Sequence, residues 1–128
     1  MTHYLSAEEI LIIHSLVVEE SGGVHGVRDS ALLESIVERP KASFAGADLH
    51  ASLTKKAAVL CEGLVNYHVF IDGNTRTAFL SLARFLHING HACTASNEMV
   101  VETMIAIADK SMQLEDIANW IDTYFKKS

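Results

Sequence analysis

The chain has 128 residues, of which 49% are hydrophobic and 20% are charged, and this composition is typical of one folded globular domain rather than a disordered chain. The net charge of −6 argues against a direct nucleic-acid partner, because nonspecific binding to DNA or RNA depends on Lys and Arg side chains that neutralise phosphates. No apolar run reaches the ~18 residues that a membrane span needs, and residues Met1–His3 begin no signal peptide, so we expect a soluble, cytoplasmic protein without a membrane partner.

Helix signals begin close to the amino terminus. The segment Ser6–Glu9 has the residues of a capping box, and it predicts a first helix over about Ala7 to Glu20, with an inward stripe that includes Ile10, Ile13, Leu16 and Val17. Asp29 is expected to cap a second helix, which Pro40 ends. The following segment, 41–50, has no helical or strand periodicity, so it is expected to be a loop or small flap of the kind that often covers a site.

Four further helices are predicted in the second half of the chain. The third covers about Ser52 to Asn66, and the fourth covers about Thr75 to Ile88. Because apolar residues occupy nearly every face of the fourth helix, we expect it to be central and buried on most sides. The fifth is expected to be capped by Ser96, and the sixth precedes an exposed basic tail at 126–127. The predicted fold is therefore all-α: a single compact domain, 1–128, of about six helices around a buried central helix.

The two cysteines lie far apart in the sequence. Cys61 and Cys93 form no C-x-x-C motif, so neither a disulfide framework nor a zinc knuckle is indicated. We expect both to be buried, reduced thiols.

The stretch His68–Arg76, with the sequence H-V-F-I-D-G-N-T-R, stands directly before the apolar fourth helix. The first N–H groups of a helix have no internal partners and carry the positive end of the peptide dipole, so a loop ending in Gly73 can present several donors to a phosphate. Arg76 adds a planar donor fork, His68 an imidazole that can accept a proton, and Asp72 a carboxylate that can bind a hard cation. Together these groups can move a phosphate-containing group from a nucleotide to a hydroxyl.

This stretch resembles the signature H-x-F-x-D/N-A/G-N-K-R of the death-on-curing (Doc) branch of the Fic/Doc superfamily, whose members are toxins of type II toxin–antitoxin modules. Eight of the nine positions satisfy that pattern. Further similarity extends over nearly the whole chain, in the segments Gly22–Asp29, Leu32–Ser35, Arg39–Pro40, Asn66–Tyr67 and Asn89–Gly90. The resemblance implies a Fic/Doc-like helical domain.

The resemblance also implies roles for individual residues. His68 matches the general base, Asp72 the ligand of a Mg²⁺ ion that bridges nucleotide phosphates, and Arg76 the arginine that clamps the phosphates. Gly73 would let the backbone approach the phosphate, and the backbone N–H of Thr75 would donate to it.

Two other motif positions have structural interpretations. Phe70 matches an aromatic residue that packs into the core and fixes the loop. Asn74 matches a phosphate-contacting position, but an asparagine directly before a helix is also a favoured N-cap, and both interpretations stay open.

For a Doc-like enzyme, the resemblance implies an ATP- and Mg²⁺-dependent kinase that phosphorylates translation elongation factor Tu, inhibits translation and arrests growth. Its implied partner is a cognate, Phd-like antitoxin whose C-terminal segment folds onto the toxin. The hydroxyl of the protein target is expected to be held against the 41–50 flap.

Thr75 leaves the orientation of the nucleotide open. The Doc branch usually has lysine at this position and the Fic branch has glycine, while the second arginine of the Fic pattern is replaced here by Phe79. AMP transfer to a protein hydroxyl is therefore the alternative reaction. A catalytically degenerate Fic/Doc-fold binding protein is the alternative outside enzymes.

Overall fold

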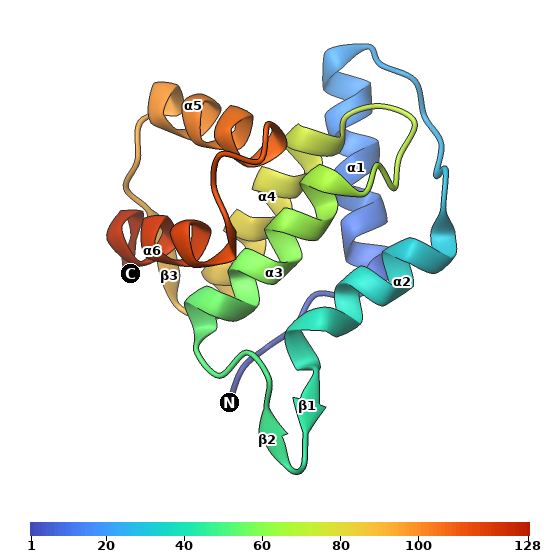
Figure 1. The fold of residues 1–128 in the computed structure, drawn as a ribbon. Coiled ribbons are helices and arrows are strands. Elements are labelled where there is room, and N and C mark those ends of the chain that lie inside the picture. Colours follow the sequence, from blue (N-terminus) through green and yellow to red (C-terminus); the bar gives the residue numbers. More distant parts are fainter.

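The computed structural model describes residues 1–128 and has six α-helices (Figure 1). Their bounds are α1 Ala7–Ser21, α2 Ser30–Glu38, α3 Leu53–Asn66, α4 Asn74–Ile88, α5 Asn97–Ala108 and α6 Leu114–Tyr124. A short 3₁₀ helix, η1, covers Arg39–Lys41, and four very short strands complete the elements: β1 Ser43–Phe44, β2 Ala47–Asp48, β3 His91–Cys93 and β4 Phe125–Lys127. The predicted all-α class is confirmed. None of the helices combines the length and apolar character needed to cross a membrane.

Side chains placed at the starts of the first two helices determine where these helices begin. The Ser6 side chain accepts the Glu9 N–H at 3.2 Å and Glu9 reaches back to Ser6, as predicted for a capping box. Asp29 accepts the Leu32 N–H at 2.9 Å and caps α2. After α2 the chain tightens into η1, whose first turn contains Pro40.

The hydrophobic core is centred on α3 and α4, which pack side by side (Figure 1). α3 contributes the longest run of buried residues, and Phe70 and Phe85 are among the largest buried side chains. α4 is central, but the expectation that it is buried on most sides is only partly correct. Leu80 and Arg84 lie on a solvent-exposed stripe of this helix, one turn apart.

The carboxyl-terminal residues pair with an earlier segment. β4 is antiparallel to β3, with Lys126 opposite Ala92, so the basic tail at 126–127 is exposed, as predicted, and forms a short strand. Cys61 is buried, and burial raises its pKa to about 12. Cys93 is exposed on β3, so the prediction of two buried thiols is wrong for this residue; both thiols are free.

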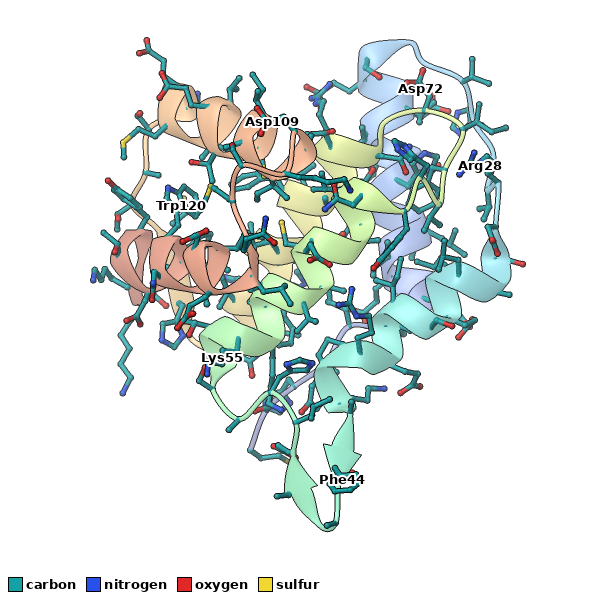
Figure 2. The ribbon with its side chains drawn as sticks, viewed as in Figure 1. Arg28, Phe44, Lys55, Asp72, Asp109 and Trp120 are labelled. Carbon is teal, nitrogen blue, oxygen red and sulfur yellow. The ribbon has the colours of Figure 1, made fainter.

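Residues 43–48 of the predicted 41–50 flap form the small hairpin β1–β2, and this hairpin lies away from the motif loop. The hairpin precedes α3 and the motif loop follows it, so the length of this helix, about 20 Å for 14 residues, separates them. Figure 2 shows Phe44 of the hairpin and Asp72 of the motif loop at opposite ends of the molecule. Lys56 anchors the hairpin by donating to the Pro40 carbonyl and the Asp48 carboxylate, both at 3.1 Å. The expectation that this flap covers the site is therefore wrong.

Candidate active site

The motif loop between α3 and α4 is paired with the loop between α1 and α2. The Arg28 N–H donates to the Val69 carbonyl at 2.7 Å, and the Ile71 N–H donates to the Gly26 carbonyl at 3.1 Å. Val27 and Phe70 form an antiparallel bridge between these two bonds. Because the α1–α2 loop satisfies backbone groups of the motif loop, the loop is held in one conformation in front of α4.

A buried histidine of α1, His14, packs against the motif loop. The His14 ring stacks on the Phe70 ring, with centroids 3.8 Å apart and planes 9° from parallel. His14 Nε2 lies 2.8 Å from the Asp72 carbonyl oxygen, which can only accept, so this nitrogen carries the hydrogen. Phe70 is 2% exposed, and its predicted role as a core anchor is confirmed.

Sequence reasoning missed His14, although its spacing was a usable signal. His14 lies four residues after Ile10 and three before Val17, and all three are buried on the same face of α1. Leu16, which was expected on the inward stripe, is 64% exposed.

Asn74 closes the motif loop onto itself. Its side-chain oxygen accepts the Phe70 N–H at 3.0 Å, and its side-chain nitrogen donates to the Phe70 carbonyl at 2.9 Å. The N-cap of α4 is Gly73, with φ 74°, and Asn74 is the first helical residue. The interpretation of Asn74 as an N-cap is therefore wrong, and its side chain is instead used to fix the loop.

Two backbone donors hold the Asp72 carboxylate. Oδ1 accepts the Gly73 N–H at 2.9 Å, and Oδ2 accepts the Val24 N–H at 3.2 Å. Gly23 lies so close that a Cβ atom at this position would be 2.6 Å from Oδ2. Asp72 remains exposed, so the α1–α2 loop orients the carboxylate without covering it.

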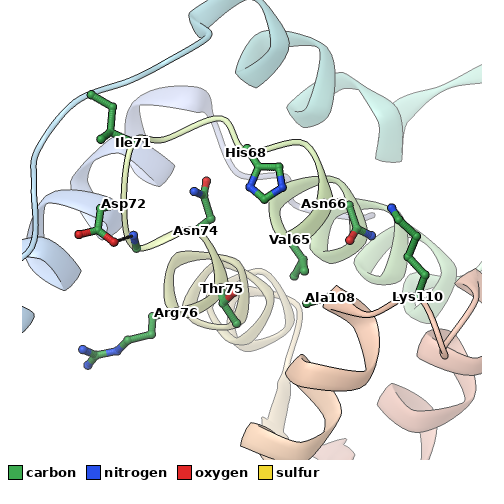
Figure 3. Close-up of a pocket in the computed structure, with 11 residues that line it drawn as sticks. Val65, Asn66, His68, Ile71, Asp72, Asn74, Thr75, Arg76, Ala108 and Lys110 are labelled. Carbon is green, nitrogen blue, oxygen red and sulfur yellow. Dashed lines mark hydrogen bonds between the residues drawn. The ribbon is translucent and has the colours of Figure 1, made fainter.

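The start of α4 is open to a pocket of about 460 Å³ (Figure 3). No side chain caps this helix, whereas α1, α2, α3 and α5 are each capped by a serine or aspartate oxygen. The first intrahelical bond of α4 runs from the Thr77 N–H to the Gly73 carbonyl, so the N–H groups of Asn74, Thr75 and Arg76 have no partner within the helix. The pocket lining is Val65, Asn66, His68, Ile71–Arg76, Ala108 and Lys110. It therefore includes every predicted site residue except the core anchor Phe70.

His68 stands at the rim of this pocket (Figure 3). Its side chain is exposed, and neither ring nitrogen is hydrogen bonded to another protein group. The backbone of His68 has φ 50°, an unfavourable conformation for a residue other than glycine. Arg28 contributes to holding it there, because its Nε donates to the His68 carbonyl at 2.9 Å. The imidazole can thus accept a proton from a group that enters the pocket.

The two cations of the pocket lie on opposite sides. Figure 3 shows Arg76 directed away from the pocket centre on the side of Asp72, and Lys110 beside Asn66 on the other side. Arg76 Nη2 is 3.7 Å from the Glu20 carboxylate, a long and exposed pair. Such surface pairs contribute little, so a phosphate can replace Glu20 as the partner of Arg76. Lys110, in the turn between α5 and α6, is a pocket residue that motif reasoning did not find.

The sequence model of the Fic/DOC family matches residues 4–86, which include α1 to α3, the whole motif loop and all but the last two residues of α4. The chain belongs to the Fic/Doc family. It is 38% identical over 120 residues to "Toxin Doc" of Mycolicibacterium smegmatis, an alignment that covers 92% of this chain and 90% of that protein. It is 27% identical over 116 residues to "Protein kinase doc" of Escherichia phage P1, with 91% and 90% coverage. Both alignments therefore cover nine-tenths of the length of the relative.

Proposed function

We propose that this protein is a Doc-like toxin that transfers a phosphoryl group from ATP to a hydroxyl of a protein target. The observation that carries the proposal is an exposed imidazole, that of His68, at the rim of a pocket built on the open start of α4. The names of the two relatives, a toxin and a protein kinase, support the same assignment. The cytoplasm, which supplies ATP and ribosomal factors, is the proposed place of action.

The proposed reaction uses the groups of the pocket in one displacement. His68 removes the proton from a Ser, Thr or Tyr hydroxyl, the hydroxyl oxygen attacks the γ-phosphorus of ATP, and the bond to the leaving ADP breaks. The free N–H groups of Asn74 and Thr75 bind phosphate oxygens, and Arg76 neutralises charge that develops on the transferred group.

The residues around Asp72 fit a magnesium ion. Protein sites for Mg²⁺ commonly supply one or two carboxylates and leave the other positions to phosphates and water, and Asp72 is exposed, with each oxygen engaged by one backbone donor. No cluster of three ligating side chains occurs in the structure, which is compatible with an ion held mainly by the nucleotide. When bound, the ion would neutralise charge on the phosphates.

The target that we propose is translation elongation factor Tu, and the consequence is inhibition of translation and growth arrest. Support comes from the family and from the toxin name of the M. smegmatis relative. A target hydroxyl would approach His68 between the α1–α2 loop and the α5–α6 turn, since the β1–β2 hairpin lies at the far end of α3.

A Phd-like antitoxin is the proposed partner, and an apolar surface on α1, α4 and α5 fits its C-terminal segment. Leu80 lines two adjoining hollows of about 500 and 400 Å³, one toward α5 and one toward α1. Ile12 of α1 and Ile105 of α5 are each about 60% exposed beside them. An amphipathic helix can bury its apolar face in such a groove. We expect Leu80→Glu to abolish rescue of growth by a coexpressed Phd-like antitoxin while toxicity remains.

Labelled ATP distinguishes the proposed reaction from its alternatives. The purified protein is incubated with a bacterial lysate and with ATP labelled at either the α or the γ position. Label on a protein of the size of elongation factor Tu from γ-labelled ATP alone supports phosphorylation, and loss of that label in His68→Ala assigns the base. Label from α-labelled ATP would identify AMP transfer.

There are two alternatives to phosphoryl transfer. The first follows from Thr75, which is neutral and exposed at the pocket. Without a fixed charge at this position the α-phosphate can take the place of the γ-phosphate, which corresponds to AMP transfer with release of pyrophosphate. The other alternative is a degenerate member that binds without turnover. Growth arrest that persists in His68→Ala would favour this non-catalytic interpretation.

A further inference from the structure

Lys110 is the cation of the pocket that has no protein partner. It makes no ion pair, and its ammonium group donates no hydrogen bond to another residue, whereas Arg76 on the opposite side pairs with Glu20. Thr75, at the helix start, brings no charge. A phosphate at the Lys110 side of the pocket would therefore meet an ammonium group that need not break an existing contact.

The turn that presents Lys110 is strained. Lys110 has φ 65°, a conformation that favours glycine. The turn is closed by the Lys110 N–H, which donates to the Ile107 carbonyl, and by Gln113 Nε2, which donates to the Lys110 carbonyl, both at 3.1 Å. The adjacent Asp109 carboxylate accepts the Ser111 N–H at 2.9 Å. The lysine side chain contributes to none of these contacts, so the turn itself does not require it.

We propose that Lys110 binds a phosphate of the nucleotide on the side of the pocket opposite Asp72 and Arg76. The inference rests on the proposed function, because it assumes that the pocket binds ATP. Cations on two sides of one pocket fit a chain of phosphates better than a single phosphate, so the site selects a nucleoside di- or triphosphate over a monophosphate. Lys110 lies beyond residues 4–86, so the matched family region does not contain it.

Calorimetric titration of the full-length protein with ATP and Mg²⁺ tests this assignment. We expect Lys110→Met to raise the Kd for ATP about tenfold, the effect of one lost charge-assisted contact. Lys110→Arg should stay within about twofold to threefold of the wild type. Lys127→Met, which removes the same charge from β4 outside the pocket, is the matched control and should leave the Kd unchanged.

AMP serves as the second ligand in the same titrations. Its one phosphate can occupy the start of α4 without reaching Lys110, so Lys110→Met should change its Kd much less than that of ATP. Equal weakening of both ligands would overturn selection for a phosphate chain.

The outcomes separate the inference from the proposed function. If the wild type binds ATP and labels a protein while Lys110→Met binds ATP equally well, the role of Lys110 is refuted and the proposed function stands. If the wild type binds no ATP, both fail.

Lys110→Gly should bind ATP as weakly as Lys110→Met but raise the Tm by about 4 °C through relief of the left-handed backbone. A lower Tm would show that the turn requires the lysine side chain, and it would contradict the inference that the backbone is strained at Lys110.

Discussion

The contact between Gly23 and Asp72 allows the orientation of one carboxylate to be tested separately from folding. In Gly23→Ala the new Cβ would lie 2.6 Å from Asp72 Oδ2 and 3.3 Å from Asp72 Cγ. Both distances are shorter than 3.4 Å, the distance at which ordinary van der Waals contact begins. The carboxylate must therefore retreat by about 0.8 Å, and it loses the 3.2 Å bond from the Val24 N–H. Because the displaced atoms are the exposed end of a side chain, we expect the free energy of unfolding to change by less than about 1 kcal/mol.

Activity should respond much more strongly than stability. A displacement near 1 Å in a catalytic site can cost about a hundredfold in rate, and loss of a supporting contact to a metal ligand typically costs about 10- to 100-fold. We expect kcat/KM for transfer from ATP to fall by about this range in Gly23→Ala. The Mg²⁺ concentration that gives half-maximal activity should rise in parallel. The assay is transfer of label measured over a Mg²⁺ titration, together with urea unfolding of the same samples.

The neighbouring glycine provides a matched control with the opposite expectation. Gly22 has φ 73°, and a Cβ atom added there would meet nothing within 4 Å, so Gly22→Ala brings backbone strain without contact to Asp72. It should lose about 1 kcal/mol of stability and keep the wild-type dependence on Mg²⁺. If a folded Gly23→Ala protein shows the same Mg²⁺ dependence as the wild type, then either the α1–α2 loop does not position Asp72 or Asp72 does not bind the metal.

Three further predictions concern the loop, the nucleotide orientation and the thiols. Asn74→Ala removes both hydrogen bonds to the Phe70 backbone, and we expect it to lower the free energy of unfolding, measured in urea, by about 1–3 kcal/mol. Asn74→Asp keeps the acceptor and should lower it less. Equal losses in the two variants would contradict the pairing of Asn74 with the Phe70 backbone. Thr75→Lys should increase transfer from γ-labelled ATP and Thr75→Gly should favour α-label, and identical products from all three forms would remove this side chain as a determinant of orientation. At pH 8 a thiol reagent should modify Cys93 alone, because burial raises the pKa of Cys61 to about 12. Cys61 should react only in denaturant. Two reactive thiols in the native protein would contradict the burial of Cys61.

Local sequence signals were sufficient for the helices but not for the support of the site. Ser6 and Asp29 define helix starts through bonds to residues three positions away, so their roles can be inferred from a short window of sequence. The pairing of residues 26–29 with 69–71 joins segments about 40 residues apart, and no local pattern specifies it. The same holds for His14, which stacks on the distant residue Phe70 and is hydrogen bonded to the carbonyl of Asp72.

The candidate site was likewise predicted only as far as its motif. The consecutive residues His68 to Arg76 fold into one loop and helix start, so most of the pocket follows from a single stretch. For Asn74 the sequence left two interpretations open, because an asparagine before a helix has the same sequence signature whether it caps the helix or has another role, and only the N-cap interpretation is wrong. Lys110 enters the pocket from another helix pair, and its position depends on how α5 and α6 pack against α3.

Backbone strain in this fold is concentrated where the proposed chemistry takes place. Three residues other than glycine have positive φ: Ala45 in the tip of the β1–β2 hairpin, His68 and Lys110. The last two both line the pocket, one carrying the proposed base and the other the proposed phosphate contact. Such conformations cost about 1–3 kcal/mol each and persist only when surrounding contacts enforce them, as the Arg28 bond to the His68 carbonyl does. Replacing Arg28 should therefore release His68 toward an ordinary backbone conformation and withdraw the imidazole from the pocket. We accordingly expect the α1–α2 loop to position the proposed base as well as the carboxylate of Asp72.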